Sequence, residues 1–434
     1  MLTVKNGTIK NGNAKIVVGY DLGNRFSQIS YYNINSPEPE TVSSVIGTQM
    51  YNIPTILAKR PGVGQWFYGK EAERYVKTEG ILVDNLLKRA ERGEEVRVED
   101  ESYDPVALLA LFMKRSLSLL SMTLSLKDID GFIITVPKLT SKTVEVLSRV
   151  VAALSLKCEY ITYQSHVESF YSYMIHQSKE LWQYQVLSLE FNESLSSMRM
   201  ECSHHTTPKV VFIHEDKYEE IVRPEWSEDE NVLARQAEEL DYSFKRLCEN
   251  ILDEGDITTI YLLGDTFKDN WSKESLKVLC KNRRVFQGNN LYSKGACYSI
   301  MDKLNPNELS KSHVYLGEEK VKSNIGLKAL RRGEDSYLAV IDAGSNWFEV
   351  KKDFDIILDE GNIITFLVTS LTGGKIIEKP IILEDLPERP YATTRLRIHI
   401  EMDAVDRVVM NIEDIGFGEI FKASGKAWSQ VIDI

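Results

Sequence analysis

The chain has 434 residues, of which 43% are hydrophobic and 27% charged, and it carries a formal net charge of −12. A single hydrophobic core rarely supports a chain of this length, so we expect two or more domains. The excess of acidic residues argues against nucleic acids and anionic membranes as partners, because both favour surfaces rich in Lys and Arg. The five cysteines form no closely spaced pair and the first residues lack an apolar signal segment, which predicts a cytoplasmic protein.

Strands and helices alternate through the first part of the chain. Apolar runs at residues 15–20 and 131–136 predict buried strands. A helix is expected to begin after Asp104, whose side chain can cap it, with Pro105 in its first turn. Another helix is expected over residues 141–154, where apolar residues recur at helical spacing. The pattern predicts layers of helices on a sheet.

The most apolar stretch of the chain runs from residue 106 to 126. Lys114 and Arg115 interrupt it, which makes it too polar to cross a bilayer comfortably. We therefore expect a buried amphipathic helix at this position and no membrane span.

The same alternation returns in weaker form from residue 186 and changes character near residue 330. We predict two α/β lobes, residues 1–185 and 186–328. Short β-branched segments separated by turns then follow, with almost no helical period. They predict an antiparallel β-sandwich or barrel over residues 329–434.

The most informative segment follows the first predicted strand. Asp21 leaves this strand and Gly23 lies two positions further on, which places a carboxylate at the tip of a hairpin. Such a turn offers backbone N–H groups to phosphate oxygens. The carboxylate also suits Mg²⁺ held through its water shell, since hard cations prefer oxygen ligands. The same pattern occurs in ordinary turns, so its neighbours decide how it is interpreted.

Those neighbours follow an order that resembles the nucleotide-binding domain of DnaK-type heat-shock chaperones, members of the actin superfamily. The motifs that carry the resemblance, after the hairpin at Asp21, are Ile53–Leu57, Phe67–Ala72, Ile129–Pro137, Ile260–Asp265 and Leu291–Cys297. The resemblance covers roughly residues 15 to 304. It implies an α/β, actin-like two-lobed ATPase fold with duplicated ribonuclease-H-like lobes. It also implies ATP or ADP with Mg²⁺ in the cleft, and a β domain that binds a protein or peptide partner.

The resemblance also assigns roles to individual residues. Asp21 is expected to hold the metal through water, and Gln164 to orient an attacking water molecule. The residues expected to bind the nucleotide are Asp21, Gly23, Asn24, Arg25, Glu190, Asn192, Gly264 and Asp265.

Several positions depart from the family pattern. The family has a second phosphate-binding turn that is rich in glycine, and here the segment from Glu190 to Leu195 stands in its place. In this segment Glu193 brings a negative side chain toward the phosphates. Glu73 stands where the family has its catalytic lysine, and Asp265 stands where a second glycine is usual. These changes predict that hydrolysis is weak or lost.

Three functions therefore remain open at this point. The first is a DnaK-like, chaperone-like protein that couples a nucleotide cleft to a partner-binding β domain. The second is a non-catalytic scaffold that keeps the fold with too acidic a cleft. The third is an ATPase or small-molecule kinase of the same superfamily.

Overall fold

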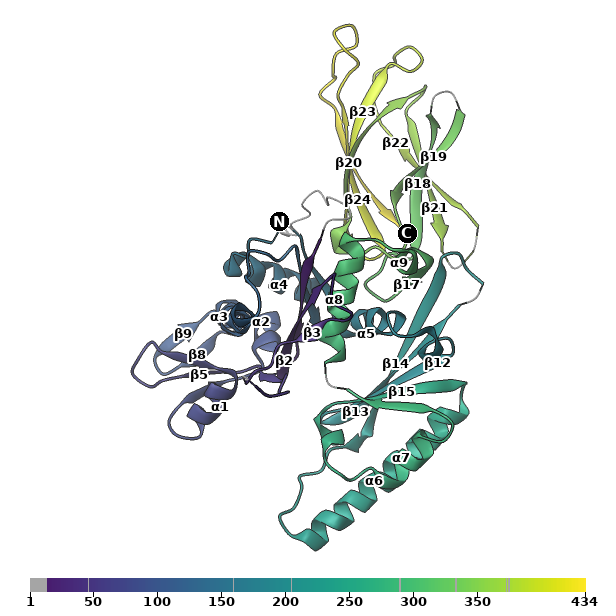
Figure 1. The fold of residues 1–434 in the computed structure, drawn as a ribbon. Coiled ribbons are helices and arrows are strands. Elements are labelled where there is room, and N and C mark those ends of the chain that lie inside the picture. Colours follow the sequence, from purple (N-terminus) through teal and green to yellow (C-terminus); the bar gives the residue numbers. More distant parts are fainter. Residues whose placement is uncertain are drawn as a thin grey trace. The chain divides into compact units, whose positions relative to one another are not determined.

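The computed structural model describes residues 14–434 except 46, 159, 204, 289, 332, 333, 372 and 374, and no side chains for 330, 331 and 334–336. The chain is mixed α/β with a β-rich C-terminal region (Figure 1). It divides into unit 1, Met1–His204 with Val211–His313, and unit 2, His205–Val210 with Val314–Ile434. The predicted boundary after residue 328 falls inside strand β18 (Ser323–Arg331).

The first sheet of unit 1 has the strand order β11-β10-β1-β2-β3, with β4 beside β2. Strand β1 runs antiparallel to β2 and parallel to β10, and β10 runs parallel to β11. The strands are β1 Ile16–Leu22, β2 Phe26–Asn33, β3 Glu40–Thr41, β4 Ile53–Pro54, β10 Gly131–Val136 and β11 Tyr160–Ser165.

The second sheet repeats this arrangement. Five of its strands run in the order β16-β15-β12-β13-β14. Strand β12 is antiparallel to β13 and parallel to β15, and β15 is parallel to β16. The strands are β12 Gln185–Phe191, β13 Ser194–Cys202, β14 Lys209–Val222, β15 Ile257–Leu263 and β16 Arg284–Gln287. Both sheets therefore share one order and one set of directions, which is the pattern an internal duplication produces.

Smaller elements extend the first repeat. They are β5 Leu57–Lys59, β6 Trp66–Tyr68, α1 Gly69–Val76, β7 Ile81–Val83, α2 Leu86–Arg92, β8 Val96–Val98, β9 Glu101–Tyr103, α3 Pro105–Leu117, η1 Ser118–Met122 and α4 Ser141–Leu154. The predicted start of α3 is confirmed, since Asp104 Oδ1 accepts the N–H of Val106 at 2.9 Å. Among the described residues, 105–122 is the one helical stretch long and apolar enough to cross a membrane, and 56% of it is buried, as in many core helices.

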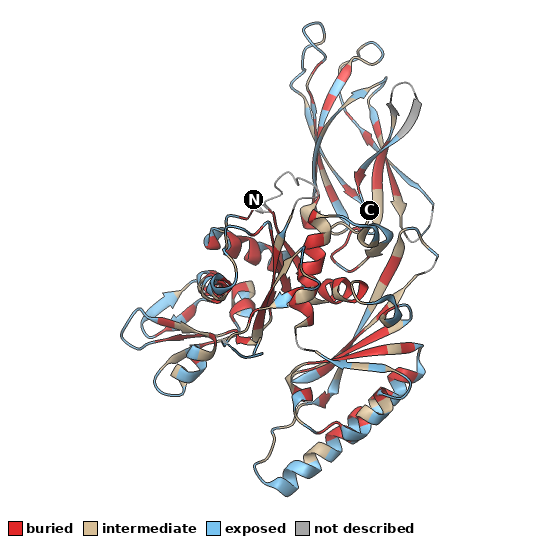
Figure 2. Ribbon diagram, viewed as in Figure 1, coloured by how far each residue is buried: buried red, intermediate tan, exposed pale blue. Residues whose placement is uncertain are grey.

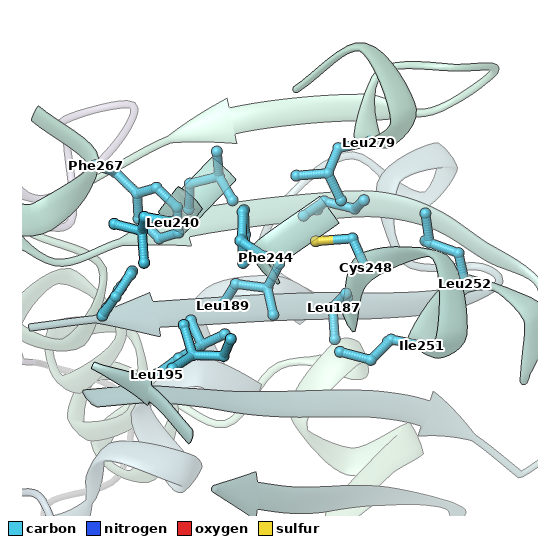
Figure 3. Packing of buried hydrophobic residues seen from close by; sticks show 14 of the residues in the cluster. Leu187, Leu189, Leu195, Leu240, Phe244, Cys248, Ile251, Leu252, Phe267 and Leu279 are labelled. Atoms are coloured by element: carbon cyan, nitrogen blue, oxygen red, sulfur yellow. The ribbon is translucent and has the colours of Figure 1, made fainter. Parts of the chain in front are cut away.

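Helix α6 (Glu230–Asp253) covers the second sheet. Asp229 caps it by accepting the N–H groups of Asn231 and Val232, which fixes where the helix begins. The first half of the helix is exposed (Figure 2). In its second half, apolar residues at spacings of three and four face the sheet (Figure 3). The core shared by α6, the sheet, η3 (Asp265–Lys268) and α7 (Lys273–Leu279) includes Leu187, Leu189, Leu195, Leu240, Phe244, Cys248, Ile251, Leu252, Phe267 and Leu279.

Helix α8 (Leu291–Leu304) follows the second repeat but packs on the first. It lies against β1 and against α5 (His166–Ile175), and it is buried along most of its length (Figure 2). A Cβ at Gly19 would collide with the backbone oxygen of Ser293, and one at Gly295 with that of Ser169. Two glycines thus allow the close approach that joins the two repeats of unit 1.

Unit 2 contains two four-stranded antiparallel sheets, in the orders β19-β18-β21-β22 and β20-β23-β24-β25. Two of their strands, β23 (Thr394–Ala404) and β24 (Arg407–Asp414), alternate between buried and exposed residues. With β18 the strands are β19 Glu334–Ile341, β20 Lys351–Leu358, β21 Ile363–Ser370, β22 Ile377–Ile382, β23 Thr394–Ala404, β24 Arg407–Asp414 and β25 Ala427–Asp433. The remaining elements are η2 Lys179–Leu181, α9 Glu308–Ser312, β17 His313–Tyr315 and η4 Trp347–Glu349.

A buried ion pair anchors the loops beside β24. Arg389 donates two hydrogen bonds to Asp414, at 2.8 and 2.6 Å, and Asp414 also accepts the backbone N–H of Gly416 and of Ser424. Burial alone would raise the pKa of Asp414, but these donors hold it well below its usual range. The carboxylate therefore stays charged and keeps both loops in place.

Replacing Gly19 with alanine tests the contact between β1 and α8. We expect the free energy of unfolding to fall by about 1–3 kcal/mol, because the new methyl group must push backbone against backbone. Urea unfolding followed by circular dichroism measures this change. Gly64→Ala is the matched control, since a Cβ there meets no atom within 4 Å, and its effect should stay within about 0.5 kcal/mol. Equal midpoints for the two variants would contradict the role given to Gly19.

Candidate functional site

A cavity of about 420 Å³ lies in unit 1 at the carboxyl ends of the parallel strands of both sheets. This is where open α/β sheets commonly bind ligands. Residues of both repeats and the first turns of α5 and α8 line it. The lining includes all eight residues expected to bind a nucleotide: Asp21, Gly23, Asn24, Arg25, Glu190, Asn192, Gly264 and Asp265.

Asp21 is held by a histidine that the sequence analysis did not single out. His166 is the first residue of α5, and its Nε2 lies 2.8 Å from Asp21 Oδ1. Their side chains are only 12% and 10% exposed, so water screens this pair poorly. Burial by itself would lower the pKa of His166, but the carboxylates of Asp21 and Glu190 outweigh it and raise the pKa above its usual value. The pair therefore favours an imidazolium bound to a carboxylate.

Like Asp21, Glu190 is held by a residue in the first turn of a helix, here α8. Tyr292 donates to Glu190 Oε2 at 2.6 Å, and the amide of Asn192 donates to Glu190 Oε1 at 2.9 Å. Burial and the adjacent Glu190 carboxylate raise the pKa of Tyr292 far above its usual value, so the phenol remains a donor. The rings of Tyr292 and His166 stack with centroids 3.9 Å apart. The partners of the Asp21 and Glu190 carboxylates, His166 and Tyr292, are thus in contact with each other through their rings, between α5 and α8.

Hydrogen bonds join the turn after β12 to the residues that follow β15. Asn192 Oδ1 accepts the backbone N–H of Asp265 at 3.3 Å, and the Asn192 carbonyl accepts the hydroxyl of Thr266 at 2.7 Å. Gly264 has a φ of 97°, and a Cβ there would collide with the backbone oxygen of Phe191. Glycine is required for both reasons at this position, which directly follows strand β15.

Polar side chains from the first repeat reach the same turn. Asn52 donates to Asp265 Oδ1 at 3.4 Å and accepts a hydrogen bond from Gln28 at 2.6 Å. Gln28 pairs with Asp21 across strands β1 and β2. Lys268 also binds Asp265, at 2.6 Å. A chain of hydrogen bonds therefore joins the two repeats along one side of the cavity.

The charge around the cavity is predominantly negative. Four carboxylates line it, at Asp21, Glu190, Glu193 and Asp265. The cationic side chains in the lining are Arg25 and Lys88, which are both exposed, and the His166 imidazolium, which is paired with Asp21. Among the described residues no cluster of three or more His, Cys, Asp or Glu suited to a metal ion is found.

Two residues discussed from the sequence lie away from the cavity. The amide of Gln164 is fully buried and donates to Ser169 Oγ at 2.6 Å, and Gln164 is not part of the lining. Glu73 is exposed on α1 and is also absent from the lining. The structure thus gathers the eight binding candidates and leaves the water-orienting candidate outside them.

His166 and Tyr292 are the principal residues that sequence reasoning missed. His166 directly follows a strand that is parallel to the strand of Asp21, and polar residues at such strand ends are often functional. That signal was present in the sequence. Tyr292 carried no comparable signal, because its place depends on how α8 crosses to the first sheet.

Comparison with known sequences gives the chain a family but no activity. Residues 38–318, more than half of the chain, match the profile described as "Family of unknown function (DUF5716) C-terminal". The chain therefore belongs to this family. Residues 320–434 match a second profile, "Domain of unknown function (DUF8552)", which starts close to the beginning of unit 2. A search of curated proteins finds no match.

The Asp21–His166 pair predicts a pH-dependent contribution to stability. A histidine whose folded pKa is raised stabilises the fold below its unfolded pKa, near 6.5, and this contribution is lost as the pH rises through the folded pKa. We expect His166→Gln to lower the free energy of unfolding by roughly 1–3 kcal/mol at pH 6, and by less at pH 9. Urea unfolding at both pH values measures the difference.

A double-mutant cycle with Asp21→Asn separates the pair from the loss of the ring itself. The coupling energy between the two positions should be larger at pH 6 than at pH 9. A coupling energy that is unchanged between the two pH values would refute the charged pair.

Proposed function

We propose that this chain is an actin-like, DnaK-like protein in which a nucleotide cleft is coupled to a β-rich unit that binds a protein partner, with hydrolysis weak or lost. The observation that carries the proposal is the convergence of the eight candidate residues on one cavity. They come from turns of two similar sheets that lie far apart in the sequence. Chance would rarely bring such a set together.

The repeated strand order supports the actin-like part of the proposal. A two-lobed fold of this kind is built from duplicated lobes, and the two sheets of unit 1 share order and direction. Helix α8 links the repeats beside the cavity, as a cleft between lobes requires.

The residues present do not suit a magnesium triphosphate. Asp21, the expected metal-holding group, already pairs with His166. The turn after β12 lacks glycines, and its Asn192 occupies the N–H of Asp265. Gln164 donates to Ser169 and lies outside the lining. We therefore assign no hydrolytic step to this cavity and propose a binding role that works without one.

The partner-binding part of the proposal rests on the surface of unit 2. Ile363 and Ile382 face each other across strands β21 and β22, and both are exposed. Grouped apolar side chains on a surface are characteristic of protein contacts. This is the support for a protein or peptide partner.

A non-catalytic scaffold is the second candidate. The four carboxylates of the cavity and their internal hydrogen bonds favour it, because such a network holds its shape without a ligand. In this case the cavity binds no nucleotide at all.

Calorimetry separates the two candidates. Titration of ADP with Mg²⁺ into the full-length protein should give a saturable heat with a Kd below about 1 mM. Asp21→Ala should strengthen this binding, because it removes a lining carboxylate that opposes the phosphates and frees the His166 imidazolium. Absence of heat at millimolar ADP with Mg²⁺ would exclude the nucleotide cleft and leave the scaffold.

A phosphate-release assay tests the proposed loss of hydrolysis. With ATP and Mg²⁺, the wild-type protein and Asp21→Ala should release phosphate at the same rate, equal to that of buffer. A wild-type rate clearly above that of Asp21→Ala would show a working ATPase and contradict the proposal. A small-molecule kinase would release no inorganic phosphate even with its acceptor present, because it transfers the phosphoryl group to that acceptor and forms ADP.

A further inference from the structure

Building on the proposed cleft, we infer that its cavity selects a ligand rich in hydroxyl groups and poor in negative charge. The structure favours a nucleoside over a nucleoside triphosphate. Four observations lead to this ligand class: the charge of the lining, the anions already bound to α5 and α8, the hydrogen bonds that close the turn after β12, and the neutral polar side chains in the rest of the lining.

The charge of the lining opposes a polyphosphate. Four carboxylates face the exposed cations Arg25 and Lys88 and the His166 imidazolium, which Asp21 already neutralises. One of the four carboxylates, Glu193, is exposed in the turn after β12. A triphosphate carries several negative charges, and each would meet these carboxylates at close range. Arg25 and Lys88 are exposed and so are screened by water. The balance of charge disfavours the terminal phosphates most.

Carboxylates of the protein already lie where the N-termini of α5 and α8 meet the cavity. The positive end of a helix favours an anion. The first residue of α5, His166, already binds the Asp21 carboxylate. The second residue of α8, Tyr292, already binds the Glu190 carboxylate. A ligand phosphate would have to compete with both.

Backbone groups in and beside the turn after β12 are also already hydrogen-bonded within the protein. The backbone N–H of Asp265 is bound to Asn192 Oδ1, at 3.3 Å. The Glu193 carbonyl accepts the N–H of Arg223 at 2.9 Å, which ties this turn to the end of β14. Cradling a phosphate here would break these hydrogen bonds.

Neutral polar groups make up much of the remaining lining. They are Asn24, Gln28, Asn52, Asn85, Ser194 and Ser196. Amides and carboxylates both accept hydrogen bonds from hydroxyl groups, and the amides also donate. A ligand hydroxyl supplies a donor, whereas a fully ionised phosphate supplies only acceptors.

The test compares four compounds on the full-length protein. Adenosine, AMP, ADP and ATP are titrated by calorimetry in EDTA, which removes divalent cations. We expect affinity to fall with each added phosphate, with adenosine at least about tenfold tighter than ATP. An affinity for ATP equal to or above that for adenosine would overturn the inference.

A charge-neutralising variant tests the cause. Glu193→Gln removes one exposed carboxylate from the cavity and should reduce the adenosine-to-ATP affinity ratio about three- to tenfold. Glu145→Gln is the matched control, because Glu145 is exposed on α4 and is not part of the lining. It should leave the ratio unchanged. A ratio that Glu193→Gln does not move, or that both variants move equally, counts against the charge argument.

The results also separate this inference from the proposed function. Binding of ADP with Mg²⁺ but not of adenosine would overturn the inference and leave the nucleotide cleft intact. Binding of adenosine alone would support the inference and exclude the nucleotide cleft. If no compound binds under either condition, both are overturned.

Discussion

Helix α8 lies directly against strand β1 because Gly19 leaves room for the backbone of Ser293. Gly295 allows the same close approach to α5. These contacts bring the end of the second repeat onto the first sheet, and they set the position of Tyr292 beside His166. The arrangement of the cavity depends on this one packing contact. A side chain at either glycine would force the two backbones apart and loosen every interaction that spans the repeats.

One result of this packing is that the central carboxylates find partners within the protein. Asp21 pairs with His166, and Glu190 accepts hydrogen bonds from Tyr292 and Asn192. Buried carboxylates are costly unless such donors meet them. In a cleft that handles phosphates, the same region must instead present donors and cations. The central carboxylates of the cavity are therefore already partnered within the protein.

Much of the fold was predictable because its signals are local. The apolar run before Asp21, the cap at Asp104 and the alternating strands of unit 2 lie where expected. The boundary of the β-rich region was harder to predict from the sequence. Strand β18 begins at Ser323, before the change of composition near residue 330, because it pairs with β19 and β21 along its length. Strand pairing, which the sequence does not show directly, determined that limit.

The sequence by itself determined which residues end the strands, and so which side chains could meet at the edges of the sheets. Asp21, the last residue but one of β1, and Gly264, which directly follows β15, lie at such strand ends. Only the tertiary structure decided how their neighbours are used. His166 lies 145 residues from Asp21 in the sequence, and Tyr292 lies 102 from Glu190. Their contacts depend on the packing of α5 against α8, because hydrogen bonds and charge pairs form according to distance in space, which local sequence patterns do not fix.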